Sequence, residues 1–107
     1  MSERIAKFLA EFKGIAETDG LHIIPRTSHN QTILKLGLTR FIVEEIILNL
    51  TAKHYSKGPM EDRDHPGTGD LYVFKTYVDS VNLYIKLKID ISNKDGKKIA
   101  KCLSFHD

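Results

Sequence analysis

The sequence predicts an α+β fold in which N-terminal helices pack on one face of a small, mainly antiparallel sheet. Hydrophobic residues recur at helical spacing in the first half of the chain, whereas the last third alternates apolar and polar residues in three segments separated by short turns. The chain has 107 residues, 41% of them hydrophobic, which suffices for one modest core and not for two. We therefore expect a single domain over residues 1–107.

Two amphipathic helices are predicted, one from residue 2 to about residue 18 and one from Arg40 to about Leu50. Thr39 is placed to cap the second helix. The apolar stripe of the first helix comprises Ile5, Phe8, Leu9, Phe12, Ile15 and Ala16. The stripe of the second helix comprises Ile42, Val43, Ile46, Ile47 and Leu50. We expect both stripes to cover the same face of the sheet.

Shorter elements are predicted between and after these helices. The apolar run Leu21–Ile24 is closed by a proline and predicts a brief strand at a sheet edge. The polar stretch Arg26–Asn30 predicts a loop, and a short helix from about Gln31 to Leu36 should follow it and stop at a glycine. The segment Ala52–Asp70 is rich in Pro and Gly and poor in apolar residues, so we expect one long loop there.

Three strands are predicted to close the chain, over about Leu71–Val78, Val81–Ile91 and Lys98–His106. The Asp79–Ser80 link between the first two is too short for anything but an antiparallel hairpin. The second pair should turn at Asn93–Gly96. These strands form a meander that the helices can cover.

Alternation along the strands assigns their side chains to two faces of the sheet. The apolar set of the middle strand should face the helices: Val81, Leu83, Ile85, Leu87, Ile89 and Ile91. Tyr72 and Phe74 of the strand before it, and Leu103 and Phe105 of the last strand, should join this covered face, which leaves Lys75 on the open side. The same alternation places on the open face Tyr84, Lys86, Cys102, Ser104 and His106.

The open face carries side chains suited to phosphodiester chemistry. His106 is of the residue type best able to act as an acid or base near neutral pH. A lysine such as Lys86 can stabilise the extra negative charge of a pentavalent phosphate transition state, and a tyrosine such as Tyr84 can hydrogen-bond a phosphate or stack on a base. A polar outer face also occurs in two-layer domains where it has no function, and that alternative stays open.

Positive charge gathers in the C-terminal hairpin although the net charge of the chain is only +2. Between Tyr84 and Lys101, six lysines stand against two aspartates, so the hairpin would attract a polyanion. Lys88, Lys101 and Ser104 are the candidate RNA contacts on it. A lysine-rich hairpin that only keeps the protein soluble would explain the same charge.

Several function classes are disfavoured by the sequence. Cys102 is the only cysteine, which allows no internal disulfide and fits a reducing cytoplasm. The N-terminus has no signal-peptide pattern, and no apolar run approaches the roughly 20 residues that span a bilayer. We expect a soluble cytoplasmic protein without membrane contact. Cys102 is interpreted as a small strand residue rather than a nucleophile.

A metal site can be imagined in the predicted long loop, where His54 and His65 lie near Asp62, Asp64 and Asp70. Their spacing matches no standard ligand motif. We therefore interpret them as solvated loop residues and expect no metal and no other cofactor.

Five short motifs follow one another over roughly residues 40–106. They are EEIILNL at the end of the second predicted helix, then HYSKGP, GDLYVF, LYIKLKI and CLSFH. In order and spacing they resemble the MqsR-like toxins of bacterial toxin–antitoxin pairs, within the broader RelE/ParE-type fold. The resemblance implies an endoribonuclease that cleaves mRNA without a metal. It also implies a cytoplasmic antitoxin partner, a protein with a helix-turn-helix DNA-binding part that inhibits the toxin.

The resemblance also implies roles for single residues. The family's Tyr-x-Lys strand falls on Tyr84 and Lys86, and the basic residue after its HYS-type segment falls on Lys57. The family's catalytic lysine after a Ser-Phe pair is replaced here by His106. Its polar catalytic residue on the preceding strand falls near Phe74, which cannot move protons, so Lys75 is the expected substitute.

The reaction expected from these residues is attack of a ribose 2′-OH on the adjacent phosphate, which gives a 2′,3′-cyclic phosphate and a 5′-hydroxyl. Two alternatives remain at this point. The open face could belong to a non-catalytic module that binds RNA or a protein and inhibits growth by occlusion. A gyrase-directed toxin of the same fold is the other, which the Tyr84, Lys86 and His106 set disfavours.

Overall fold

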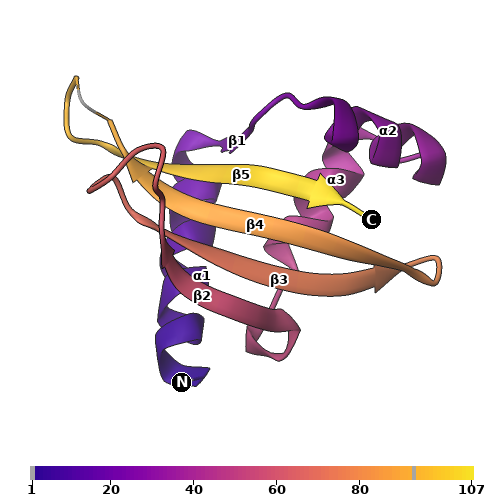
Figure 1. The fold of residues 1–107 in the computed structure, drawn as a ribbon, viewed down its shortest axis with the longest axis horizontal. Helices are drawn as coiled ribbons and strands as arrows, with labels where there is room; N and C mark the ends of the chain where they lie inside the picture. The colour runs from indigo at the N-terminus through magenta and orange to yellow at the C-terminus, as the bar shows by residue number, and fades with distance from the viewer. Residues whose placement is uncertain (1, 93) are drawn as a thin grey trace.

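The computed structural model describes residues 2–92 and 94–107 and has an α+β architecture (Figure 1). The α-helices in those residues are α1 (Ser2–Asp19), α2 (Thr27–Leu36) and α3 (Arg40–Leu48), and a short 3-10 helix, η1 (Ala52–His54), follows. The strands are β1 (Leu21–Ile23), β2 (Tyr55–Glu61), β3 (Asp70–Val78), β4 (Val81–Ile91) and β5 (Lys98–His106). The predicted combination of helices with a small, mainly antiparallel sheet is confirmed.

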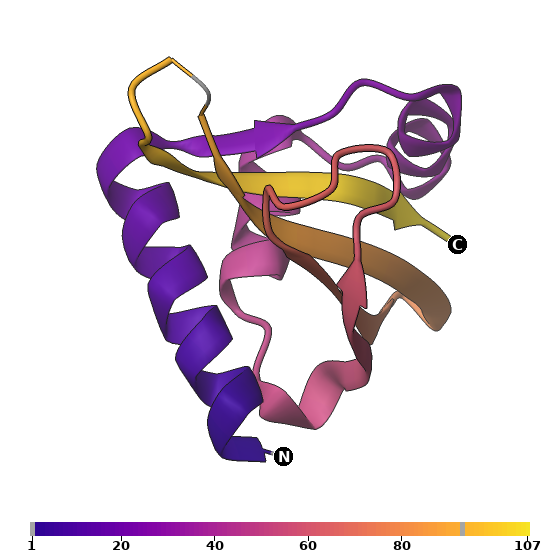
Figure 2. The same cartoon turned by 60° about the vertical axis from the view of Figure 1, so that its left-hand side comes forward.

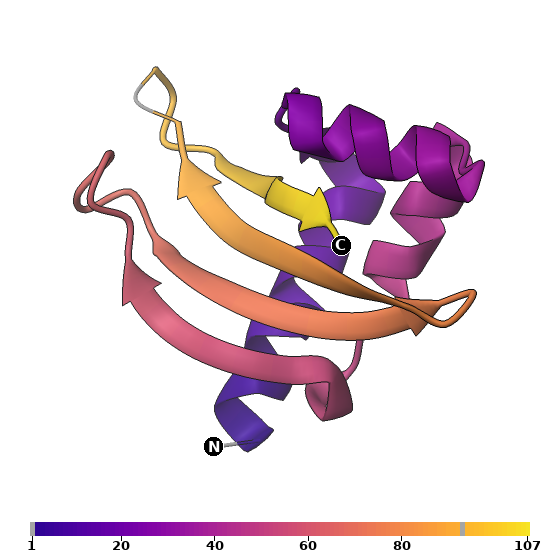
Figure 3. The same cartoon turned by 45° about the vertical axis from the view of Figure 1, so that its right-hand side comes forward.

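The strands form one sheet in the order β1-β5-β4-β3-β2. β1 runs parallel to β5, and every other neighbouring pair is antiparallel. Helices α1 and α3 lie behind this sheet in Figure 1, whereas α2 lies beside the C-terminal end of β5 (Figure 3). The face turned away from α1 and α3 is called the open face below.

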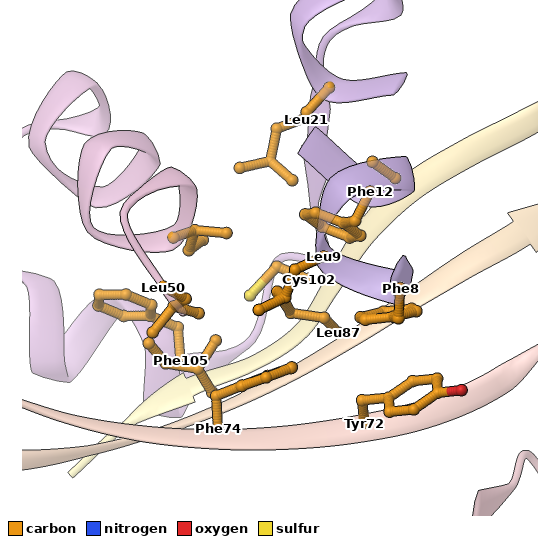
Figure 4. Close-up of a cluster of buried hydrophobic side chains, with 14 of the residues drawn as sticks. Phe8, Leu9, Phe12, Leu21, Leu50, Tyr72, Phe74, Leu87, Cys102 and Phe105 are labelled. Carbon is orange, nitrogen blue, oxygen red and sulfur yellow. The ribbon is translucent and has the colours of Figure 1, made fainter. Parts of the chain in front are cut away.

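The core lies between α1, α3 and the covered face of the sheet (Figure 4). The ring of Phe8 stacks on Tyr72 with 3.9 Å between centroids, and Phe12, Phe74 and Phe105 are fully buried. The predicted stripe of α1 is confirmed, with Ile15 only partly buried. Burial of these aromatic and aliphatic side chains is the main force that holds the helices on the sheet.

Helix α3 largely follows its prediction. The Thr39 hydroxyl accepts a hydrogen bond from the backbone N–H of Ile42, so the predicted cap is confirmed. Val43, Ile47 and Leu50 are buried as expected. Ile42 is 39% exposed, so the expected stripe is wrong at that position.

Helix α2 is longer than predicted. It begins at Thr27 rather than near Gln31, so the loop expected over Arg26–Asn30 is wrong for most of its length. Arg26 holds the N-cap position in an extended conformation and makes no side-chain cap hydrogen bond, which explains why no capping signal marks the start. The helix ends at Gly37, as expected, with φ 66° in the left-handed region.

The long loop predicted over Ala52–Asp70 is also wrong, because η1 and strand β2 occupy its first half. β2 is an edge strand paired only with β3, and two register shifts interrupt the pairing. Edge strands tolerate the glycine and proline that argued for a loop, since one side of the backbone faces no neighbour. The strand places Lys57 opposite Val73.

A β-bulge in β5 changes which side chains reach the open face. Lys86 pairs with Ser104 but Leu87 pairs with Cys102, so one extra residue, Leu103, interrupts the ladder. Phe105 is buried as expected. The predicted faces of Cys102 and Leu103 are wrong, because Cys102 faces the core and Leu103 lies on the open face. Cys102 is fully buried next to Leu87 in the core (Figure 4), and burial raises the pKa of its thiol to about 12. The interpretation of Cys102 as a small strand residue rather than a nucleophile is therefore confirmed.

The segment between β2 and β3 folds back over the open face at one end of β4 and β5 (Figure 2). Asp62, in this segment, bonds to Lys88 of β4. Gly69 approaches β4 so closely that a Cβ atom there would collide with the carbonyl oxygen of Ile89. Because the collision partner is backbone, only glycine fits at this position.

The β3–β4 turn offers a test of the fold. Asp79 and Ser80 have φ values of 51° and 66°, so both central residues of the two-residue turn lie in the left-handed region. Ser80→Gly is expected to raise the free energy of unfolding by about 0.5–1 kcal/mol, because glycine adopts this conformation without steric cost. Urea denaturation measures the change.

Ser80→Ala is the matched control, since alanine also carries a Cβ and should give no such gain. Equal unfolding free energies for the glycine and alanine variants would show that the turn does not hold this backbone.

Candidate functional site

The sequence-predicted catalytic residues lie in two rows across the open face. In the first row, Tyr84 of β4 pairs with Lys75 of β3 on one side and with His106 of β5 on the other. In the second row, two residues further along, Lys86 pairs with Val73 and Ser104, and Lys57 pairs with Val73 from β2. The strand register therefore brings together side chains that are up to 49 positions apart in the sequence.

The side chains of these rows converge on Tyr84. The imidazole of His106 stacks on the phenol ring with 5.2 Å between centroids and 22° between planes. The ammonium nitrogens of Lys57 and Lys86 lie 5.9 Å and 6.0 Å from the centre of the same ring. A tyrosine flanked by an imidazole and two ammonium groups is a surface on which a base can stack and a phosphate can be held.

The lysines around Tyr84 carry charge that no carboxylate in the described part of the chain neutralises. Among the described residues, Lys57, Lys75 and Lys86 make no ion pair with a carboxylate. Holding like charges together without a counter-ion is unfavourable in the absence of a ligand, and a bound anion relieves this cost. This end of the open face therefore carries positive charge that would attract an anion.

The orientation of His106 suits proton transfer. Its Nδ1 lies 3.1 Å from the main-chain oxygen of Asp107. Because a main-chain oxygen only accepts hydrogen bonds, Nδ1 carries the proton in this contact, and the neutral ring then keeps its lone pair on Nε2. A general base requires such a lone pair.

Two side chains of α2 bind Asp107, the residue whose main-chain oxygen orients His106. The Asp107 carboxylate accepts hydrogen bonds from Lys35 Nζ at 2.6 Å and from Thr32 Oγ1 at 3.1 Å. The bond from Lys35 and then that from Thr32 lower the pKa of the Asp107 carboxyl below its usual value. This anchor ties the end of β5 to α2 and so fixes the position of the imidazole.

Lys88 is not available to RNA, contrary to the prediction. Its side chain is only 3% exposed, and Nζ lies 2.6 Å from Asp62 Oδ2 and 2.7 Å from Thr68 Oγ1. The hydrogen bond from Lys88 lowers the pKa of Asp62. The interpretation of Asp62 as a solvated loop residue is therefore wrong as well, since it is a buried ion-pair partner.

The remaining candidate contacts lie closer to solvent. Lys101 is partly exposed and pairs with Asp90 at 2.5 Å, which leaves part of its donor capacity free. Ser104 is partly exposed beside Lys86, and its backbone oxygen accepts the thiol hydrogen of Cys102 at 3.3 Å across the bulge.

Sequence reasoning missed one histidine near the site. His29 belongs to α2 rather than to a loop, is 1% exposed, and neither ring nitrogen has a hydrogen-bond partner among the described residues. Its pKa is lowered because burial, the charge of Arg26 and, more weakly, that of His106 outweigh the backbone groups of Leu103 and Ile24, which favour the protonated ring. No local signal marks this position, because its burial depends on where α2 packs against β5.

The residues considered for a metal site are dispersed. His54 closes a capping box at η1, in which its Nδ1 accepts a hydrogen bond from the backbone N–H of Thr51 at 2.9 Å. Within residues 2–92 and 94–107, no group of three or more His, Cys, Asp or Glu side chains is arranged to hold a metal ion.

Comparison of the chain with protein-family models, curated proteins and solved structures found no match. In the part of the chain that the structure describes, no helix combines the length and apolar character that crossing a membrane requires.

Proposed function

We propose that this chain is an endoribonuclease that cleaves single-stranded mRNA by attack of a ribose 2′-OH on the adjacent phosphate. The observation that carries the proposal is the stacking of His106 on Tyr84 beside Lys57 and Lys86, which have no carboxylate partner among the described residues. Such a site combines a proton acceptor with preorganised positive charge, the two requirements of metal-independent RNA cleavage.

His106 Nε2 accepts the proton of the 2′-OH, and the freed oxygen forms a bond to phosphorus. The extra negative charge of the resulting phosphorane lies within reach of the Lys57 and Lys86 ammonium groups that flank Tyr84. The bond to the 5′-oxygen then breaks and that oxygen takes up a proton from water, while His106 releases its proton to the solvent, which leaves a 2′,3′-cyclic phosphate and a 5′-hydroxyl. The phenol ring of Tyr84 supports the base or the scissile phosphate.

The wider assignment rests on the ordered motifs in the sequence. Under it the chain is a single RelE-like, MqsR-like toxin domain of a type II toxin–antitoxin pair and acts in the cytoplasm. Its inhibitor is a cognate antitoxin protein with a helix-turn-helix DNA-binding part. Phe74 is fully buried, whereas Lys75 is exposed next to Tyr84, which supports Lys75 as the substitute for the family's polar residue.

A second candidate is a non-catalytic module that inhibits growth by binding RNA or a protein. The partly exposed ring of Tyr84 with its flanking cations favours it, because single-stranded RNA binds to such sheets without being cut. The two candidates differ in the fate of the strand and in the role of His106.

The proposed reaction requires the 2′-OH at the cut site. RNA with a single 2′-deoxy nucleotide at that position is expected to survive at that bond, whereas the all-ribose strand is cut to a 2′,3′-cyclic phosphate. Gel analysis of end-labelled oligonucleotides, with mass spectrometry of the products, measures both outcomes. Cleavage of the deoxy-substituted strand at the same bond would rule the mechanism out.

A further inference from the structure

A small pocket lies on the open face at the opposite end from Tyr84. It has a volume of about 130 Å³ and is formed between the β1–α2 connection, the segment that follows β2, and strands β4 and β5. Asp62 and Lys88, the buried ion pair, make up part of its lining. The bond between Asp62 and Lys88 fixes the segment after β2 over the sheet, so this wall of the pocket is held in place by a buried contact. Figure 2 shows this segment crossing the open face.

The free hydrogen-bonding capacity of the pocket belongs mostly to donors. Lys88 Nζ donates hydrogen bonds to Asp62 and Thr68 and lies 3.6 Å from the carboxylate of Asp90, so it has little capacity left for a ligand. Lys101 makes one contact, to Asp90, and a lysine has three N–H donors. Arg26 is exposed, and among the described residues its side chain pairs with no carboxylate and makes no cap hydrogen bond to α2, so its N–H donors are available to a ligand. Three cations face two carboxylates here, which favours an anionic ligand.

The pocket also has an apolar wall. Ile24 and Leu103 line it, and Leu103 reaches the open face only because the bulge in β5 reverses the alternation. Free donors beside an apolar wall suit a ligand with an anionic group joined to a less polar body. A nucleotide has this composition, with its phosphate next to its ribose and base.

The position of the pocket fits a strand that also crosses Tyr84. Lys88 follows Tyr84 by four residues on β4, which corresponds to about 13 Å along the strand. Stacked nucleotides are about 3.4 Å apart and splayed ones are further apart, so this distance spans about two to four nucleotides.

We propose that this pocket binds one nucleotide of the RNA substrate, about two to four nucleotides from the scissile phosphate. Arg26 and Lys101 hold its phosphate, and Ile24 and Leu103 pack against its ribose or base. The assignment rests on the proposed ribonuclease function, because the strand that crosses Tyr84 is taken to be the substrate. The pocket then sets the register in which RNA lies on the sheet.

The test replaces Arg26, which is exposed and makes no side-chain cap hydrogen bond to α2. Arg26→Ala is expected to raise KM for a ten-nucleotide RNA about 10-fold and to leave kcat unchanged, because the lost contact lies away from the reacting bond. Arg4→Ala is the matched control: the same charge is lost from an exposed position on α1, on the covered side of the sheet. It should leave KM unchanged.

A binding measurement separates this inference from the proposed function. In a His106→Ala background, Arg26→Ala should weaken binding of the same RNA about 10-fold and reduce the salt dependence of binding by about one phosphate contact. Unchanged RNA affinity and KM in the Arg26 variant would overturn the pocket assignment even if the wild-type protein cleaves RNA. If the wild-type protein does not cleave, the proposed function fails, and the binding result still decides whether Arg26 holds an RNA strand.

A free nucleotide could supply the same chemistry as an RNA strand. Adenosine and uridine 5′-monophosphate are titrated while the methyl signals of Ile24 and Leu103 are followed by NMR. Binding of either mononucleotide more tightly than the ten-nucleotide RNA would overturn the assignment in favour of a small-molecule site. Weaker mononucleotide binding that shifts the same methyl signals supports it.

Discussion

His106→Ala is expected to lower the rate constant for RNA cleavage by about 10²–10⁴-fold while RNA affinity stays nearly unchanged. The side chain supplies the Nε2 lone pair that accepts the 2′-OH proton, and Nδ1 is committed to the main-chain oxygen of Asp107. Positive charge from Lys57 and Lys86 remains, so the strand should still bind. Single-turnover cleavage and fluorescence anisotropy with labelled RNA measure the two quantities.

His22→Ala is the matched control for this experiment. His22 is exposed on β1 and pairs with Lys101, which lies five residues before His106. Its loss should leave both cleavage and binding unchanged. If the His106 variant still cleaves at the wild-type rate, the imidazole is not the base. If growth inhibition by the protein also persists in that variant, the non-catalytic binding module becomes the better account.

The sequence predicts an element well where alternation or helical spacing alone decides it. In β4, Leu83, Ile85 and Leu87 are fully buried on the covered face as expected, and Val81 and Ile89 are partly buried there. Ile91 is 44% exposed, so the prediction is wrong at that position. Helix α1 buries its predicted stripe for the same reason. In each case the pattern is local, and one buried face is enough to fix the structure.

Features that depend on pairing with distant residues were not predictable in this way. Cys102 and Leu103 are both apolar, so the alternation of side chains is compatible with either of them facing the core. Only the register against Leu87 decides between them. The glycine and proline within β2 indicate a loop by local rules, and pairing with β3 makes this segment a strand instead.

The candidate site shows the same division. Tyr84, Lys86 and His106 could be placed on one face by alternation, because the bulge lies outside the Ser104–His106 segment. Alternation along β4 places Lys88 on the same face as Lys86, yet Lys88 is buried in an ion pair whereas Lys86 is partly exposed. Asp62, 26 residues earlier, buries the Lys88 ammonium, and no local pattern indicates where the segment around Asp62 packs.

Asp62→Ala is expected to lower the free energy of unfolding at pH 7 by about 3–5 kcal/mol, since it leaves the Lys88 ammonium buried without its carboxylate partner. Most small domains have only about 5–15 kcal/mol of stability, so the loss is a large fraction of the total. Asp64→Ala is the matched control, because Asp64 is exposed in the same segment and contributes only its backbone N–H to Asp62. Urea denaturation of both variants gives the comparison.

A double variant tests whether the cost arises from the unpaired charge. Replacing Lys88 by Met together with Asp62→Ala removes both charges, and it should recover part of the stability that the single substitution loses. If the double variant is no more stable than Asp62→Ala alone, the loss comes from packing in the segment after β2 and not from the buried ammonium.

The pH dependence of the same pair has a definite sign. The bond from Lys88 lowers the pKa of Asp62 in the folded protein below its usual value of 3.8. The folded state then binds fewer protons than the unfolded state, so the stabilisation is fully present above pH 3.8 and is lost as the pH falls through the lower folded pKa. The stability difference between wild type and Asp62→Ala should therefore shrink in acid. A difference that stays constant through this range would show that the Asp62 carboxylate does not gain its stability from Lys88.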